Sequence, residues 1–479
     1  MIAMSVPVTA HGGGVEGFGM TEAEKARLLE TLRAQVGRHG PIARAADPVN
    51  QPMIRRWCAA MADHNPSYLD PQFAARSIHG EIVAPPAMLV TWAIADGAAD
   101  GDPFHSVLAR LRAAGYSGAV GTSTEHEYRR YLKLGEVPVA SQSVTDISAE
   151  KQTALGAGHF VTTLTEYRAA GGELLGSVKF VVLAYKPHAG GSGPVAGEPR
   201  PRRPRPGISR DTQFFWEGLK AGELRIQQCR GCATLHHPPR VRCHACGSYD
   251  FGYVVASGRG TVYSFVEPCH PRVPAFDYPY TVALVELAEG TRLITNLVDL
   301  DPEQVKIGMP VELVWRWPDP ELVLPMFRPQ RPSRRETTLD FAEVSAGDEL
   351  PPCPVPITAT LIVAGAIASG DFTDFHHDRA AAIKQGAPDI FMNILTTGGL
   401  CASYLSDWAG PEAVLRRLSL RLGVPNYPGD TMTLSGTVLS ARSEGGAGLI
   451  EVGLRGYNRL GNHVTGRVEL ALPGARRGQ

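Results

Sequence analysis

Two parts of the chain repeat the same order of features, and this duplication constrains the fold more than any other part of the sequence. Asp63 and Asp371 each open a polar loop that leads into alanine-rich sequence, a glycine and a long apolar stretch. Residues 132–144 then parallel residues 426–438, and both copies end in two alternating segments around a glycine-containing turn. Period-two alternation predicts strands, and the apolar stretches predict helices. We therefore expect an α+β protein with two domains, each a long helix wrapped by a curved antiparallel sheet.

Segments rich in proline and arginine divide the chain into blocks. With 479 residues the chain exceeds what one hydrophobic core normally serves. Residues 188–210 and 326–336 cannot build a core, because proline, glycine and arginine dominate them. The expected parts are a flexible tail at 1–20, a first copy at 21–187, a stiff linker at 188–210, a middle domain at 211–327 and a second copy at 328–479.

Composition and charge argue against several classes of protein. Hydrophobic residues make up 43% and charged residues 20%, as in ordinary globular proteins. The formal net charge of -1 gives no reason to expect nucleic acid or an anionic membrane as partner. The sequence contains neither a secretory leader nor an apolar run of about 18 residues. A cytoplasmic protein that binds neither membranes nor nucleic acid is expected.

Four of the eight cysteines form two Cys-x-x-Cys pairs separated by ten residues. They are Cys229, Cys232, Cys243 and Cys246. Four thiolates at this spacing are typical of a closed tetrahedral zinc site, which is structural because no coordination position is left for water. A redox dithiol or an iron site is the alternative.

The sequence after the cysteines is rich in predicted strands. Residues 257–316 alternate apolar residues with glycine and acidic turns, which indicates a small five-stranded barrel. Together with the preceding helix and cysteines, this block resembles the acyl-CoA-associated family of OB-fold and zinc-ribbon domains. That resemblance implies a protein-docking role. Nucleic-acid binding is an alternative, although the block lacks a dense stripe of basic and aromatic residues.

The loop of the second copy carries a family resemblance. Residues 368–378 read ASGDFTDFHHD and resemble the signature Gly-Asp-x-Asn-Pro-x-His of the MaoC-like enoyl-CoA hydratases, which have a hot-dog fold. The matching positions are Gly370, Asp371 and His376, whereas Thr373 and Asp374 replace Asn-Pro. In the first copy Asp63, Asn65 and Pro66 match, but Tyr68 stands where the histidine belongs.

This difference separates a catalytic copy from an inert one. Hydration of an enoyl thioester needs a group that exchanges protons near neutral pH, which histidine does and tyrosine does not. The resemblance implies that Asp371 and His376 hold the attacking water. It also implies that a backbone amide of Met392 or Asn393, at the start of the apolar helix, hydrogen-bonds the thioester carbonyl oxygen. A coenzyme A thioester is then the substrate, and no redox cofactor is needed.

The first copy and a group of arginines carry further expectations. Pro85 and Pro86 remove amide donors where an oxyanion site would lie in the first copy, which supports its inertness. In double hot-dog proteins that this chain resembles, the inert half shapes the acyl pocket. The arginines that might meet coenzyme A phosphates, unless they form a solvated face, are Arg416, Arg417 and Arg421.

The order of inert hot-dog, zinc ribbon with OB-fold, and catalytic hot-dog resembles a fused form of the two-subunit hydratase of actinobacterial steroid side-chain breakdown. This resemblance implies hydration of a bulky enoyl-CoA, with the product passed to a thiolase-like aldolase docked on the OB-fold domain. A homodimer is expected. The alternatives are a non-enzymatic scaffold or acyl-CoA-binding partner, and a nucleic-acid binder.

Overall fold

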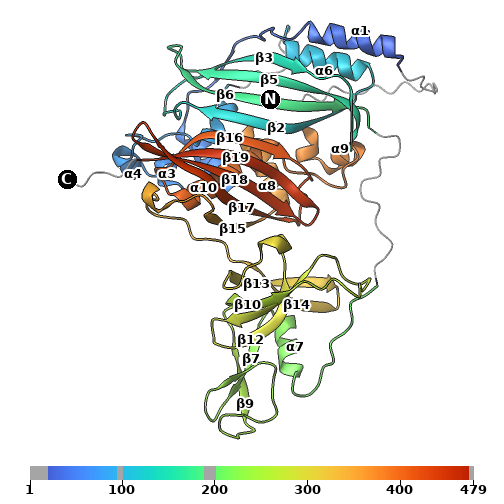
Figure 1. The fold of residues 1–479 in the computed structure, drawn as a ribbon, viewed down its shortest axis with the longest axis vertical. Helices are drawn as coiled ribbons and strands as arrows, with labels where there is room; N and C mark the ends of the chain where they lie inside the picture. The colour runs from blue at the N-terminus through green and yellow to red at the C-terminus, as the bar shows by residue number, and fades with distance from the viewer. Residues whose placement is uncertain (1–19, 94–100, 188–200, 474–479) are drawn as a thin grey trace.

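The two copies and the middle domain are separate regions of the computed structural model, which describes residues 20–93, 101–187 and 201–473. The expected tail lies outside the described residues except for its last residue, as does the 188–200 part of the expected linker. In Figure 1 the N-terminal copy packs directly against the C-terminal copy, and the middle domain extends from this pair.

One continuous sheet joins the two copies. Its eleven strands follow the order β1-β3-β5-β6-β2-β16-β19-β18-β17-β15, with β4 paired to β5. The N-terminal strands are β1 (Ala43–Arg44), β2 (Gly118–Tyr128), β3 (Val139–Ile147), β4 (Lys151–Thr153), β5 (Gly156–Arg168) and β6 (Leu174–Tyr185). The C-terminal strands are β15 (Glu349–Pro356), β16 (Val414–Leu422), β17 (Thr431–Glu444), β18 (Ala447–Asn458) and β19 (Gly461–Leu472). The seam is the antiparallel pair β2 and β16, in which His126 lies opposite Leu418.

The helices of the two copies differ. The C-terminal copy has α8 (Ala359–Ser369), the short η4 (Asp374–His376), α9 (Arg379–Lys384) and the long α10 (Ile394–Ala409), with η3 (Phe341–Glu343) before β15. The N-terminal copy has α1 (Glu22–Arg33), α2 (Gln51–Met61), α3 (Pro66–Leu69), α4 (Pro71–Arg76), η1 (Pro86–Met88), α5 (Leu89–Trp92) and α6 (Pro103–Ala113). Its expected long apolar helix is therefore, in the described residues, one 3₁₀ turn and one α-helical turn, followed after residue 100 by the separate helix α6.

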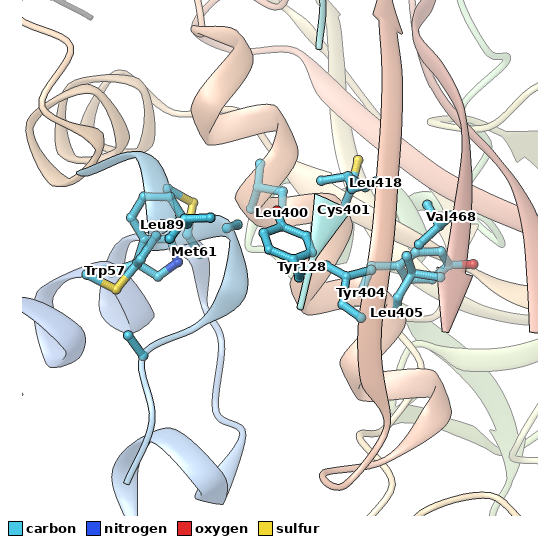
Figure 2. Close-up of a cluster of buried hydrophobic side chains, with 14 of the residues drawn as sticks. Trp57, Met61, Leu89, Tyr128, Leu400, Cys401, Tyr404, Leu405, Leu418 and Val468 are labelled. Atoms are coloured by element: carbon cyan, nitrogen blue, oxygen red, sulfur yellow. The ribbon is translucent and has the colours of Figure 1, made fainter. Parts of the chain in front are cut away.

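The main core lies between the two copies, under α10. A Cβ atom on Gly399 would lie 2.7 Å from Met61 Sδ and 3.0 Å from the Trp57 ring, so glycine lets α2 and α10 touch. Figure 2 shows Trp57 and Met61 facing Leu400 of α10. Each large apolar side chain buried here contributes roughly 1.5–3 kcal/mol. The copies are thus held together by a shared hydrophobic core and a shared sheet.

The middle domain contains a small three-stranded sheet and a closed barrel. Helix α7 (Gln213–Lys220) precedes the sheet of β7 (Arg225–Cys229), β8 (Leu235–His236) and β9 (Phe251–Val255). The barrel consists of β10 (Arg259–Val266), β11 (Thr281–Leu287), β12 (Arg292–Leu297), β13 (Pro310–Asp319) and β14 (Leu322–Pro329), with η2 (Pro302–Gln304) after β12. The prediction of a five-stranded barrel is confirmed. An ion pair of 2.6 Å between Asp301 and Arg455 attaches the barrel to the C-terminal copy.

Among the described residues, no helix combines the length and the apolar character needed to cross a bilayer.

Candidate active site

Asp371 and His376 come together in the C-terminal copy. Helix α8 ends at Gly370, whose left-handed backbone (φ 69°) turns the chain into the loop that starts with Asp371. The single 3₁₀ turn η4 then brings His376 back toward Asp371, so that His376 Nε2 lies 3.4 Å from Asp371 Oδ2. His376 is only 5% exposed. The loop therefore holds a shielded carboxylate and imidazole side by side.

The second nitrogen of His376 fixes which nitrogen carries the proton. Nδ1 lies 2.6 Å from the carbonyl oxygen of Phe391, and a carbonyl oxygen only accepts hydrogen bonds. In the neutral imidazole Nδ1 therefore donates, and Nε2 presents its lone pair toward Asp371. Because this lone pair and the carboxylate both accept, one water molecule can donate a hydrogen bond to each. This is the arrangement a general base needs.

Asp371 stays ionised because its neighbours lower its pKa more than burial raises it. Burial alone would raise its pKa, but the interaction with His376 in its protonated form and hydrogen bonds from Thr373 and Asn393 lower the pKa to about 2. Thr373 Oγ1 donates to Oδ1 at 2.7 Å, and Asn393 Nδ2 donates to Oδ2 at 3.0 Å. Thr373 occupies the place of the family's asparagine and still binds the carboxylate.

A cavity of about 650 Å³ adjoins this pair at the seam of the two copies. One wall carries Asp371, His376 and the first residues of α10, and the opposite wall comes from α6, β2 and β6 of the N-terminal copy. Its apolar lining includes Phe104, Leu108, Val120, Phe180, Val182, Phe375, Ile394 and Leu422. The cavity has the size and the largely apolar lining typical of small-molecule sites.

The start of α10 borders the same cavity. Asn393 is the N-cap, and its Oδ1 accepts from the amide of Thr396 at 2.7 Å. Of the two expected oxyanion donors, the Met392 amide already donates to the carbonyl oxygen of Asn426 at 3.1 Å. No described residue accepts a hydrogen bond from the Asn393 amide. The Asn393 amide is therefore the better placed of the two.

The corresponding place in the N-terminal copy is filled. Asp63 and Tyr68 border a space of only about 10 Å³, together with Pro85, Pro86 and Tyr131. That volume holds at most about one water molecule. The loop instead bonds the C-terminal copy, because Asn65 Nδ2 donates to Ser406 Oγ at 2.9 Å and to the carbonyl oxygen of Pro411 at 3.1 Å.

The buried Asp63 gives a pH-dependent prediction. Burial is the main cause that raises its pKa, to about 7. The folded protein then binds this proton more tightly than the unfolded chain, whose carboxyl titrates near 3.9, so native stability falls as pH rises from about 4 to about 7. Asp63→Asn keeps an oxygen to accept from the Asn65 amide (3.0 Å) and removes the charge. We expect the variant to gain up to about 4 kcal/mol over wild type at pH 8 and almost nothing at pH 4 in urea unfolding. An equal gain at both pH values would contradict this explanation.

The three arginines that were expected to meet coenzyme A phosphates do not line the cavity. Arg416, Arg417 and Arg421 are exposed residues of β16, and none lines the cavity. Arg417 pairs with Glu125, and Arg416 Nη1 donates to the carbonyl oxygen of Arg129 at 3.3 Å. These contacts fit the solvated face that was the alternative.

Other arginines do line the cavity. They are Arg38, after α1, and Arg110 and Arg112 of α6, and no ion pair to them occurs in the described part of the chain. Sequence reasoning missed them because nothing in the sequence indicated that α6 would face the site of the other copy. His105 of α6 also lines the cavity, with Nδ1 2.6 Å from Asp102 Oδ2.

The four cysteine sulfurs of the middle domain meet at one point. One sulfur from each of Cys229, Cys232, Cys243 and Cys246 lies within 4.8 Å of the others. The left-handed backbone of Ala233 and Gly247 turns the chain back after each pair. Four thiolates without a further ligand fit a structural zinc ion and leave no open position for catalysis.

Comparison with known proteins places these parts in a family. Family models match residues 34–176 as "FAS1-like, dehydratase domain region", 216–252 as "ChsH2, rubredoxin-like zinc ribbon domain" and 253–316 as "ChsH2, C-terminal OB-fold domain". The probable enoyl-CoA hydratase alpha subunit of Thermomonospora curvata is 44% identical over 308 residues, which cover 63% of this chain and 96% of the relative. The chain belongs to the MaoC-like enoyl-CoA hydratase family.

Further relatives resemble smaller shares of the chain. For the 3-oxo-4,17-pregnadiene-20-carboxyl-CoA hydratase of Mycobacterium tuberculosis, the alpha subunit is 42% identical over 57% of this chain and 88% of the subunit. Its beta subunit is 51% identical over 24% of this chain and 84% of the subunit. A "DUF35 domain-containing scaffold protein" of Methanocaldococcus jannaschii is 38% identical over 21% of this chain and 74% of that protein.

A solved structure shows the same fold for almost the whole chain. A "MaoC-like dehydratase" covers 93% of this chain and 100% of that chain at 18% identity, with a TM-score of 0.51. The predicted double hot-dog with zinc ribbon and OB-fold is confirmed.

Proposed function

We propose that this enoyl-CoA hydratase adds water to a bulky, steroid-like α,β-unsaturated acyl-CoA at the seam cavity, with Asp371 and His376 as the catalytic pair. The supporting observation is the shielded pair, 3.4 Å apart, beside a cavity of about 650 Å³. A steroid acyl group is proposed because the two subunits of the Mycobacterium tuberculosis hydratase that resemble this chain are named for a pregnadiene-carboxyl-CoA.

The geometry supports a simple sequence of proton transfers. Water held by Asp371 and His376 attacks the β-carbon, and His376 Nε2 takes its proton. The electrons of the double bond move toward the thioester carbonyl, where the Asn393 amide at the positive end of α10 stabilises the oxyanion. The imidazolium then returns the proton to the α-carbon, so that H and OH are added in total. Thr373 and Asn393 keep the Asp371 carboxylate oriented throughout.

The decisive experiment is mass spectrometry of water addition across enoyl-CoAs from crotonyl-CoA to tetracyclic acyl groups. We expect an 18-dalton gain with the highest kcat/KM for the bulky substrates, because the N-terminal copy has no long helix over this part of the sheet in the described residues. Absence of turnover with every enoyl-CoA, alongside retained acyl-CoA binding, would favour the alternative of a non-enzymatic acyl-CoA-binding partner.

We propose that the arginines of the cavity bind the coenzyme A phosphates. Each exposed ion pair contributes up to about 1 kcal/mol and weakens with salt. We therefore expect Arg38→Ala, Arg110→Ala and Arg112→Ala combined to raise KM about tenfold or more at low salt, and less at high salt, with kcat little changed. The control combines Arg416→Ala, Arg417→Ala and Arg421→Ala on β16. An equal KM increase in the control would return the phosphate site to β16.

We propose that the middle domain docks a thiolase-like aldolase, which cleaves the β-hydroxyacyl-CoA. Support comes from its similarity to a protein named as a scaffold and from the exposed apolar residues Tyr263 and Ile294 on the outside of the barrel. The test is co-purification of an aldolase with the full chain. The aldolase should be lost in Ile294→Glu while hydration stays intact.

We further propose a homodimer in the cytoplasm, where thiols stay reduced. Light scattering tests the dimer, which should have a molar mass of twice the chain mass.

A further inference from the structure

Two phenylalanine rings form a stacked pair beside the proposed base His376, called here the phenyl pair. Phe375 belongs to η4 and directly precedes His376, whereas Phe391 lies two residues before the N-cap of α10. The two ring centroids are 5.0 Å apart, and the angle between the ring planes is 8°. Both residues are half-buried and line the seam cavity. The phenyl pair therefore joins the loop of Asp371 and His376 to the residues that lead into α10.

The imidazole of His376 packs against both rings of the phenyl pair. Its centroid lies 4.6 Å from that of Phe375 and 5.2 Å from that of Phe391, and the ring planes meet at 72° and 75°. The three centroids form a nearly equilateral triangle, with the imidazole almost perpendicular to both phenyl rings. Edge-to-face contacts are favourable because the positive edge of one ring meets the negative face of another. They restrain the rotation of the imidazole about its Cβ–Cγ bond, which the covalent structure alone leaves broad.

Phe391 restrains His376 in a second way, through its main chain. Its carbonyl oxygen accepts the hydrogen bond from His376 Nδ1 at 2.6 Å. This bond fixes one nitrogen and the ring contacts fix the plane, so the position of Nε2 relative to Asp371 is determined. Phe391 is also only two residues from Asn393, whose amide is the proposed oxyanion donor. The same residue is thus tied to the proposed base and to the proposed oxyanion site.

We propose that Phe375 and Phe391 are positioning residues that hold the imidazole of His376 in a fixed place relative to the start of α10. Hydration needs two groups to act on one enoyl thioester. His376 Nε2 takes the proton of the water that attacks the β-carbon, while the Asn393 amide stabilises the charge on the carbonyl oxygen. A misplacement of about 1 Å can lower the rate about 10²-fold. The inference rests on the proposed function and adds two residues that act on the reaction through His376.

The test replaces one ring of the phenyl pair by an aliphatic side chain. Phe375→Leu should lower kcat for a bulky enoyl-CoA about tenfold to hundredfold. The dissociation constant of the matching saturated acyl-CoA, which undergoes no proton transfer, should change by less than about threefold. Phe375→Tyr keeps an aromatic ring at this position and should keep kcat within about threefold of wild type. The unfolding temperature of each variant shows that it is folded.

The same replacement in the His376→Ala variant separates positioning from the shape of the pocket. Without the imidazole the phenyl pair has no group to position, so Phe375→Leu should lower the residual rate by less than about twofold. The matched control is Phe104→Leu, which changes a ring of α6 that lines the opposite wall of the cavity. Its effect on kcat should be the same with and without His376, because changes at independent sites add.

Three results would overturn the inference. The first is an unchanged kcat in folded Phe375→Leu. The second is an equal loss of rate from Phe375→Leu with and without His376, and the third is a loss of saturated acyl-CoA binding that matches the loss of kcat/KM. The last two would make Phe375 a wall of the acyl pocket only. Failure of wild type to hydrate any enoyl-CoA would instead overturn the proposed function, so the two failures are distinguishable.

Discussion

His376→Ala is expected to lower kcat for enoyl-CoA hydration by about 10²–10⁴-fold. The imidazole is the group beside Asp371 that can take the proton of water near neutral pH, and its Nδ1 is already committed to Phe391. Substrate binding should change little, because many other residues line the cavity. Stopped-assay kinetics with a bulky enoyl-CoA measure the loss.

Two control variants make this result specific. His377→Ala changes the neighbouring exposed histidine and should leave kcat within about twofold. Tyr68→His restores the family's histidine in the N-terminal copy but should add no activity, since only about 10 Å³ is open there. Retained activity in His376→Ala, with a normal unfolding temperature, would remove His376 from the mechanism.

Loss of zinc is expected to unfold the zinc ribbon while hydration continues. A structural zinc site supplies roughly 10–16 kcal/mol of binding free energy, which is far more than a ribbon this small gains from its own core. Cys243→Ser removes a buried ligand of the four-sulfur cluster. We expect zinc content, measured by elemental mass spectrometry, to fall from one to near zero per chain, and residues 225–255 to lose protection from hydrogen exchange.

The two hot-dog copies should be insensitive to this change. The four sulfurs belong to the middle domain, whereas Asp371 and His376 lie in a loop of the C-terminal copy, whose sheet and core contain no described residue of the ribbon. Cys269→Ser, which changes an exposed cysteine outside the cluster, is the control. If Cys243→Ser abolished hydration while Cys269→Ser did not, the zinc ribbon would have to support the active site directly.

Much of the architecture was predictable because it depends on local patterns. Alternating residues predicted the strands, and the spacing of four cysteines predicted a cluster that the fold brings within 4.8 Å. The pair Asp371 and His376 was predicted from the resemblance of one short loop to the hydratase signature, and in the structure a single 3₁₀ turn brings the two side chains together. Chemistry and spacing in one short loop are properties of the sequence.

The arginines show where such reasoning ends. Arg416, Arg417 and Arg421 were expected near coenzyme A because basic residues cluster there, yet strand β16 turns them to the outer face. Arg38, Arg110 and Arg112 line the cavity only because β2 pairs with β16 and sets the N-terminal copy against the start of α10. The choice between the two expected oxyanion donors also depended on the tertiary structure. The Met392 amide donates to the carbonyl oxygen of Asn426, which lies far along the chain, so the Asn393 amide is the better placed donor.

By itself, the sequence determined which copy keeps the histidine of the hydratase signature, which four thiols can hold zinc, and how the domains follow one another. Only the tertiary structure decided that the N-terminal signature loop is closed and bonds the other copy, and that α6 forms the far wall of the cavity at the seam. The physical reason is that side-chain chemistry and short-range turns are local, whereas a cavity between two domains is set by packing and strand pairing between residues hundreds of positions apart.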